Sequence, residues 1–323
     1  MIVWGLQALA VASVLSAVIA VGLIAFDRPE VGSATGGLDF SNATNAVIKM
    51  PTPHKLPMRD GFGLTVWDYP NASGPLVVMV HRSGWNGRQY NGLAPVLQAH
   101  SHVVVVDLRG HGRAPGRRGD IDYIGQFEDD LNDVITSQAV PGQKVVLLGH
   151  SSGGGLVVRF AGGMDHHVLD GAVLLAPFLQ HNAPTTRKKS GGWAQPLTRR
   201  IIGLTMLNAV GITVLNHLKV ITFNMPRDIL DGAFGDMATT AYSYRLNTSY
   251  APRRNYLKDI TALPPFLLIA GQEDEAFVAE GYAPLMQPVT DTGQYLVDPG
   301  QRHLGIVDAP ATAAAIGAYL DAV

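Results

Sequence analysis

The sequence predicts an α/β protein in which a doubly wound, mostly parallel sheet is covered by helices on both faces. Short apolar runs without polar alternation recur along the chain, as expected of strands that are buried on both faces. Helix-length segments separate these runs, and strand–helix alternation is typical of a doubly wound sheet. With 323 residues, 47% of them hydrophobic and 15% charged, the chain is long and apolar enough to bury such a core.

The N-terminal 26 residues differ in composition from the rest of the chain. From Met1 to Phe26 there is no charged side chain. A helix of that length, rising about 1.5 Å per residue, spans the roughly 30 Å hydrocarbon core of a bilayer. We therefore expect residues 1–26 to form a transmembrane anchor, with a cleaved signal peptide and a buried core helix as alternatives. A signal peptide is disfavoured because a cationic start is missing and its apolar run is usually about 7–15 residues long.

The orientation of this anchor depends on the charges that flank it. Asp27, Arg28 and Glu30 follow the apolar segment, so no cluster of positive charge holds the C-terminal side in the cytosol. We expect the folded domain on the outer, periplasmic-type side of the membrane. Residues 27–44 contain Gly, Ser, Asn and Thr without periodicity and are interpreted as a linker.

The predicted α/β core comprises residues 45–177 and 260–323. Helices are expected over Tyr123–Ala139 and Gly154–Gly163, and an antiparallel edge pair near Ala46–Met50 and Phe62–Asp68. The parallel strands are predicted at Pro75–His81, His102–Asp107, Lys144–Gly149, Gly171–Ala176, Pro265–Gly271 and Gln294–Asp298. Residues 178–259 break this alternation with amphipathic segments rich in Leu, Ile and Met, and we expect them to form a helical cap inserted between two core strands.

Gly149-His150-Ser151-Ser152-Gly153 matches the G-x-S-x-G nucleophile elbow. A predicted strand precedes the motif and a glycine-rich helix start follows it, which is the context that the motif requires. Small neighbours are needed because the serine of such an elbow lies in a strained turn. Ser151 is therefore the candidate nucleophile.

A serine hydroxyl needs a general base, which an acid in turn orients. Chains with this elbow place the three residues in the order serine, acid, histidine. Asp274 follows the strand Pro265–Gly271, and His303 follows the last predicted strand. Asp274 is the candidate acid, with Glu273 and Glu275 beside it, and His303 is the candidate base.

The oxyanion of a tetrahedral intermediate requires backbone N–H donors. The geometry of the elbow assigns one donor to Ser152. The second donor is expected in the loop after the strand Pro75–His81, within Arg82-Ser83-Gly84, and Ser83 is the candidate.

Several further segments resemble the α/β-hydrolase superfamily. Asp107–Ala114 looks like its D-x-R-G-H-G-x-S segment, with Ala114 where serine is usual. Other segments are similar to the branch of monoacylglycerol lipases and lysophospholipases: His81–Gly84, Gly87–Tyr90, Gly116–Asp122 and Phe127–Leu131. The resemblance covers Leu76 to Ala176 and resumes from Pro265, and it implies the α/β-hydrolase fold and hydrolysis of lipidic esters without a cofactor. Arg82 stands where the branch has glycine, so Arg82 is kept as a candidate contact for an acidic headgroup.

The composition limits the alternatives. The chain has no cysteine, which excludes disulfides, thiolate nucleophiles and cysteine-bound zinc. A net charge of −2 favours no nucleic-acid partner, and no metal site is expected. We predict a serine hydrolase acting on a small hydrophobic ester. An aminopeptidase, thioesterase or acyltransferase on the same fold stays open, as does, more remotely, a non-catalytic binding protein tethered to the membrane. The sequence does not indicate the oligomeric state.

Overall fold

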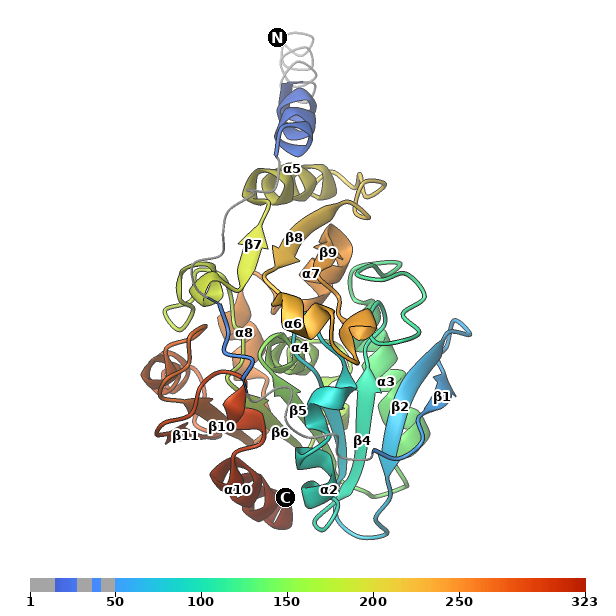
Figure 1. The fold of residues 1–323 in the computed structure, drawn as a ribbon, viewed down its shortest axis with the longest axis vertical. Coiled ribbons are helices and arrows are strands. Elements are labelled where there is room, and N and C mark those ends of the chain that lie inside the picture. The colour runs from blue at the N-terminus through green and yellow to red at the C-terminus, as the bar shows by residue number, and fades with distance from the viewer. Residues whose placement is uncertain (1–14, 28–36, 42–49) are drawn as a thin grey trace, which may run out of the picture.

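The computed structural model describes residues 15–27, 37–41 and 50–323. Among these residues, eight strands form one twisted sheet in the order β1-β2-β4-β3-β5-β6-β10-β11 (Figure 1). The strands β4, β3, β5, β6, β10 and β11 pair in parallel, whereas β1 and β2 form an antiparallel edge. The bounds are β1 His54–Pro57, β2 Gly63–Tyr69, β3 Leu76–Val80, β4 His102–Asp107, β5 Val145–His150, β6 Gly171–Leu175, β10 Phe266–Gly271 and β11 Gly293–Asp298. The predicted mostly parallel α/β sheet is confirmed.

The sheet has a separate apolar core on each face. In β3, Leu76, Val78 and Val80 belong to one core and Val77 and Met79 to the other. This division follows from the alternation of side chains along a strand. The first core is covered by α3 (Gln126–Gln138) and α4 (Ser152–Ala161), and the second by α2 (Leu93–Leu97) and α10 (Pro310–Ala322). Helices on both faces explain why these strands are apolar without interruption.

The parallel register brings four functional loops to one edge of the sheet. Val80 at the end of β3 pairs with Gly149 in β5, and Gly271 at the end of β10 pairs with Asp298 at the end of β11. The segments after β3, β5, β10 and β11 therefore leave the sheet at the same edge. Ligands bind at this carboxyl edge in open α/β sheets.

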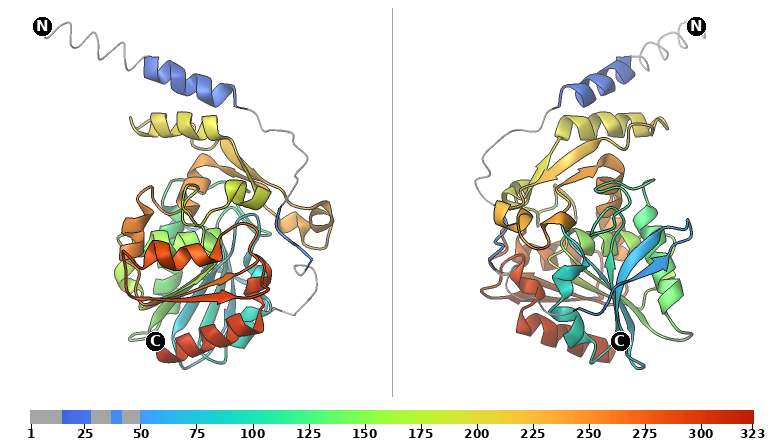
Figure 2. Two further views of the ribbon diagram at one scale, coloured as in Figure 1. Left: turned by 90° about the vertical axis from the view of Figure 1, so that its left-hand side faces the viewer. Right: turned by 45° about the vertical axis from the view of Figure 1, so that its right-hand side comes forward.

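A cap lies over that edge and is inserted between β6 and β10 (Figures 1 and 2). Its helices are α5 (Thr198–Asn208), α6 (Arg227–Leu230), α7 (Tyr244–Tyr250) and α8 (Tyr256–Thr261). The predicted helical cap also contains strands, because β7 (Ala194–Pro196), β8 (Lys219–Phe223) and β9 (Ala241–Ser243) form a three-stranded antiparallel sheet. Strands of three to five residues are too short for a two-residue periodicity to stand out in the sequence.

The predicted edge pair differs from the structure in its first strand. The second strand, β2, agrees with Phe62–Asp68, but its described partner is β1 at His54–Pro57. Most of Ala46–Met50 lies outside the described residues, and Met50 itself is not in a strand. The α9 helix (Tyr282–Met286) lies between β10 and β11 and completes the core.

Residues 15–25 form a helix that packs against α5 of the cap (Figure 2). Ala20 and Ile24 share a small apolar cluster with Leu204 and Leu207. The helix at residues 15–25 and α5 can pack this closely because residue 203 is glycine: a Cβ atom there would lie 2.6 Å from the carbonyl oxygen of Ala20. Within the described part of the chain, no helix is long and apolar enough to cross a bilayer. The first half of the predicted anchor and most of the predicted linker lie outside the described residues.

Candidate active site

Ser151 occupies a strained turn between β5 and α4. Its φ of 57° and ψ of −119° lie outside the common regions for a residue with a side chain. The turn is tight enough that a Cβ atom at Gly149 would lie 2.3 Å from the carbonyl oxygen of Gly153. A Cβ atom at Gly153 would in turn lie 2.3 Å from the carbonyl oxygen of Val80. The small residues of the G-x-S-x-G motif are therefore required by backbone packing.

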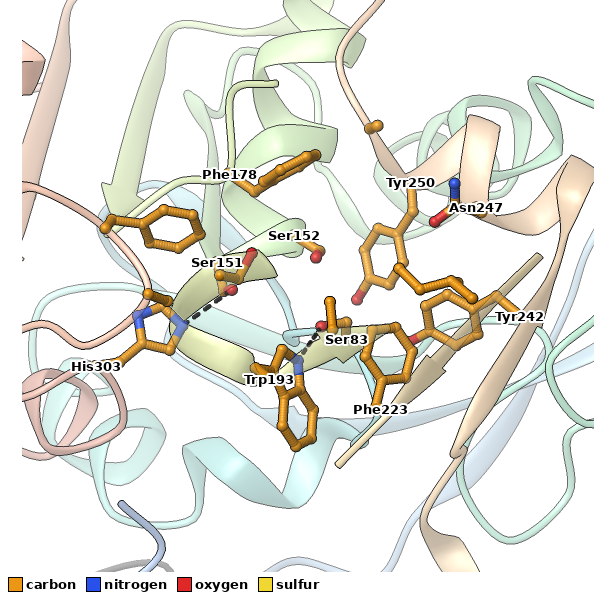
Figure 3. Close-up of a pocket in the computed structure, with 16 residues that line it drawn as sticks. Ser83, Ser151, Ser152, Phe178, Trp193, Phe223, Tyr242, Asn247, Tyr250 and His303 are labelled. Atoms are coloured by element: carbon orange, nitrogen blue, oxygen red, sulfur yellow. Dashed lines mark hydrogen bonds between the residues drawn. The ribbon is translucent and has the colours of Figure 1, made fainter. Parts of the chain in front are cut away.

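The structure brings Ser151, His303 and Asp274 into one chain of hydrogen bonds (Figure 3 shows the first two side chains). The Oγ atom of Ser151 lies 3.0 Å from Nε2 of His303. The Nδ1 atom of His303 lies 2.7 Å from Oδ2 of Asp274. A carboxylate can only accept, so Nδ1 carries the proton and Nε2 is left to accept from the serine hydroxyl. This is the arrangement in which an imidazole acts as a general base on a serine.

Asp274 is held rigidly in the loop after β10. Its second carboxylate oxygen, Oδ1, accepts hydrogen bonds of 2.7 Å from the backbone N–H groups of Ala276 and Phe277. The side chains of Asp274 and His303 are buried. Because both oxygens of Asp274 are engaged, the carboxylate fixes one orientation of the His303 ring.

Ser83 and Ser152 both line the cavity that contains Ser151. Neither backbone N–H group donates a hydrogen bond to another described residue. Both are therefore available to an oxyanion, as the predicted roles require. The positive φ in the loop after β3 falls on Gly84 (77°), whereas the φ of Arg82 is not positive. The replacement of the usual glycine by Arg82 thus introduces no left-handed strain.

Buried tyrosine and histidine side chains support the loop Arg82-Ser83-Gly84, which contains the predicted oxyanion donor. The Tyr242 hydroxyl accepts a 2.6 Å hydrogen bond from the Gly84 N–H and lies 2.7 Å from Nε2 of His111. Burial lowers the pKa of His111 to about 4 and that of His81 well below its usual value, so both imidazoles are neutral. The hydroxyl of Tyr250 donates to the carbonyl oxygen of His81. Two tyrosines of the cap therefore position the predicted oxyanion loop.

Arg82 is not among the described residues that line the cavity containing Ser151. Its guanidinium carbon lies 5.3 Å from the ring centre of Phe40, 5.7 Å from that of Trp85 and 5.6 Å from that of Trp193. One guanidinium N–H donates to the carbonyl oxygen of Ser83 at 3.0 Å. Burial lowers the pKa of Arg82 to about 10, which leaves the side chain charged at neutral pH. Within the described ranges no carboxylate pairs with Arg82, and cation–π contacts take the place of such a partner.

Two cavities lie beside these residues. The first has a volume of about 70 Å³, contains Ser151 and His303, and is lined by aromatic side chains that include Phe178, Trp193 and Phe223 (Figure 3). None of the described residues lining it is an aspartate or a glutamate. The second cavity, of about 560 Å³, is lined by Arg82, Arg88, Gln89 and His150 among others. The candidate substrate contact Arg82 therefore belongs to the second cavity.

Sequence reasoning missed the residues that support the site from a distance. Tyr242, Tyr250 and Trp193 all belong to the cap, where no motif is present. The Nε1 atom of Trp193 donates to Oγ of Ser83 at 3.2 Å. In the sequence His111 is recognisable only as part of a motif, and no local pattern indicates its proximity to Tyr242 of the cap.

Comparisons with known proteins identify the family to which the chain is similar. A family model described as serine aminopeptidase, S33, matches residues 72–309. The monoacylglycerol lipase of Mycolicibacterium smegmatis is 30% identical over 34% of this chain and 42% of that protein. The chain spans only 25% to 42% of the length of the curated relatives that it matches.

Solved structures show the same fold over a longer part of the chain. The monoacylglycerol lipase of Paleococcus ferrophilus has a TM-score of 0.59 and 20% identity, covering 80% of this chain and 98% of that chain. A membrane phospholipase A, described as a bacterial virulence factor, has a TM-score of 0.60 and 18% identity. That likeness covers 99% of this chain and 97% of the phospholipase chain.

Proposed function

This chain belongs to the serine aminopeptidase S33 family of α/β hydrolases, and from that membership we propose that it is a serine ester hydrolase with Ser151, His303 and Asp274 as its catalytic triad. The observation that carries the proposal is the unbroken hydrogen-bond chain of 3.0 Å and 2.7 Å that ends on a serine in a strained elbow. The proposed substrates are lipidic esters such as monoacylglycerols or lysophospholipids.

The proposed reaction proceeds in two acyl-transfer steps. His303 takes the proton of Ser151 at Nε2 while Oγ attacks the ester carbonyl carbon. The Ser83 and Ser152 N–H groups bind the oxyanion that forms, and each such donor contributes roughly 3–4 kcal/mol in hydrolases of this kind. The intermediate collapses, and the leaving alcohol receives the proton from His303. Water then gives a proton to His303 and attacks the acyl carbon. The second intermediate collapses by breaking the bond to Oγ of Ser151, which takes the proton back from His303, and the carboxylic acid is released.

The lining of the first cavity favours an ester over a peptide with a free amino terminus. An aminopeptidase has to bind the α-ammonium group of its substrate, for which a carboxylate is the natural partner. The described residues that line the cavity include no carboxylate. An apolar acyl group instead matches Phe178, Phe223 and Ile221.

The small volume of this cavity sets a condition for lipidic substrates. About 70 Å³ is well below the roughly 300–1,000 Å³ of typical ligand pockets. A long acyl chain therefore enters only if cap side chains separate from the core. An apolar cap that opens at a membrane surface fits that requirement.

The proposed location is an N-terminal membrane anchor with the catalytic domain on the outer side. Residues 1–26 carry no charge, and in the described helix Leu15, Val18 and Val21 are more than half exposed. The likeness to a membrane phospholipase A over 99% of this chain also favours it. Protease treatment of intact spheroplasts tests the location: digestion before lysis is expected, and protection until lysis contradicts an outer domain.

The proposed activity is tested on the full chain in detergent with p-nitrophenyl esters of two to sixteen carbons, beside Ser151→Ala. We expect hydrolysis by the wild-type chain and its loss in the variant, together with rapid labelling of the wild-type chain by a fluorophosphonate. A chain-length optimum at eight or more carbons supports lipidic substrates, whereas an optimum at two to four carbons restricts the proposal to small esters. Equal activity in both chains rejects the triad, and inactivity of both favours a transferase, a peptidase or a binding role.

A further inference from the structure

The N-terminal segment at residues 37–41 is tied directly to the loop that carries His303. The carboxylate of Glu275 accepts two backbone hydrogen bonds, one from the Asp39 N–H and one from the His303 N–H, each of 2.9 Å. Arg302 adds an ion pair of 3.1 Å with the Asp39 side chain. Figure 1 shows this segment as a short blue stretch between two grey traces. One carboxylate thus joins residues that are 264 positions apart, from Asp39 to His303.

The same segment also contacts the predicted oxyanion loop. The Phe40 ring lies 5.7 Å from the Trp193 ring and 5.3 Å from the guanidinium carbon of Arg82. Trp193 donates from Nε1 to Oγ of Ser83, and Arg82 donates to the Ser83 carbonyl oxygen. Phe40 therefore packs on both side chains that bind Ser83.

Burial shows that the segment is part of the folded core. Leu38 and Phe40 are 8% and 7% exposed and belong to the larger apolar core beside Trp193 and Phe223. The residues of the segment show no helical or strand periodicity, so its position is not set by secondary structure. Its position against the core is set by its contacts with Glu275, Arg302, Arg82 and Trp193.

We infer that residues 37–41 complete the active site, with Glu275 and Phe40 as positioning residues for His303 and for the Ser83 loop. This inference rests on the proposed serine hydrolase function. A general base must lie within hydrogen-bond reach of the nucleophile, and a displacement of about 1 Å can lower the rate about 100-fold. A segment that holds the base on one side and the oxyanion loop on the other controls that geometry without touching the substrate.

The inference is tested in the full chain in detergent, because a fragment that starts at residue 45 lacks the segment. Glu275→Gln leaves one oxygen to accept a hydrogen bond and turns an NH₂ group towards the other backbone N–H. Phe40→Leu removes the ring and keeps an apolar side chain. The matched controls are Glu280→Gln, an exposed carboxylate in the segment between β10 and α9, and Phe26→Leu, an exposed phenylalanine in the N-terminal segment. Hydrolysis of p-nitrophenyl butyrate, the fluorophosphonate labelling rate and the thermal midpoint are measured for each variant.

We expect Glu275→Gln and Phe40→Leu each to lower kcat and the labelling rate about tenfold, with KM within about twofold of the wild-type value. The controls are expected to match the wild-type chain. A purely structural role predicts a lower thermal midpoint with wild-type kcat in the folded fraction, and that result overturns the inference. If Glu275→Gln fails to fold, the kcat, labelling rate and thermal midpoint of Phe40→Leu test the inference by the same criteria. An active Ser151→Ala chain rejects the proposed function instead, so the two failures are distinguished.

Discussion

The hydroxyl of Tyr242 accepts a 2.6 Å hydrogen bond from the backbone N–H of Gly84, although 158 positions separate the two residues. The same hydroxyl lies 2.7 Å from Nε2 of the neutral His111 ring, to which it donates. Gly84 is next to Ser83, whose N–H is the proposed oxyanion donor. The cap therefore supplies part of the support for an element of the core.

Tyr242→Phe is expected to lower kcat without a comparable change in KM. The substitution leaves the Gly84 N–H and Nε2 of His111 without a partner, and a buried unsatisfied polar group costs about 1–3 kcal/mol. Tyr69→Phe is the matched control, because the buried Tyr69 hydroxyl has no hydrogen-bond partner among the described residues. Steady-state kinetics with a soluble ester measure the effect. Equal kcat values for the two variants contradict a positioning role for Tyr242.

Asp274→Asn is expected to reduce kcat about 10⁴-fold while the chain stays folded. The amide oxygen can still accept from the Ala276 and Phe277 N–H groups, which turns the NH₂ group towards His303. Nδ1 of His303 must then accept, so Nε2 carries the proton and cannot act as a base towards Ser151.

The control for Asp274→Asn is Asp298→Asn, which changes a buried aspartate at the end of the neighbouring strand β11. Kinetics and thermal unfolding are compared for the two variants. A similar loss of activity in both variants assigns the effect to general disturbance of this edge of the sheet.

Arg82→Gln tests whether Arg82 contacts an acidic headgroup from the second cavity. A charge-assisted hydrogen bond contributes about 1.5–3 kcal/mol. We therefore expect kcat/KM for a lysophosphatidate to fall at least about tenfold more than kcat/KM for the monoacylglycerol with the same acyl chain. Arg113→Gln is the control, since Arg113 is an exposed surface residue. An unchanged ratio of the two rates removes Arg82 as a substrate contact and leaves its aromatic packing as its role.

Asp107 is expected to make stability depend on pH. Burial raises the pKa of Asp107 to about 7, against about 3.9 in the unfolded chain. The folded state thus holds the proton more tightly, so this contribution to stability is complete below about pH 4 and is lost as the pH rises through about 7.

Asp107→Asn removes this titration. The amide oxygen retains the 2.7 Å hydrogen bond from the Gly87 N–H. We expect the advantage in stability of the variant over the wild-type chain to be largest at pH 8.5 and to shrink as the pH falls towards about 4. Thermal denaturation at a series of pH values measures this, and parallel curves for the two chains refute the raised pKa.

The β5–Ser151–α4 unit was predictable from the sequence because its determinants are local. Continuous apolar residues specify a strand buried on both faces, and Gly149 and Gly153 are the residues that a tight turn accepts. The positions of Asp274 and His303 followed from chain order, since parallel strands deliver their carboxyl ends to one edge.

The cap and the N-terminal segment could not be predicted in this way. Short strands such as Ala194–Pro196 and Ala241–Ser243 gain their conformation from pairing with Lys219–Phe223. The segment at residues 37–41 gains its place from contacts with Glu275 and Trp193. Such interactions join residues that are far apart in the chain, and no periodicity or motif in either of the two interacting segments indicates them.

The parallel sheet, the elbow at Ser151 and the order of the candidate triad can be predicted from the amino-acid sequence, because hydrophobic periodicity and backbone sterics act within a few residues. Three further relationships are visible only in the folded chain: Arg82 lines a second cavity, Tyr242 binds the loop that contains Ser83, and Glu275 joins Asp39 to His303. Hydrogen bonds and aromatic contacts reach only a few ångströms, so they form between residues distant in the chain only after it has folded.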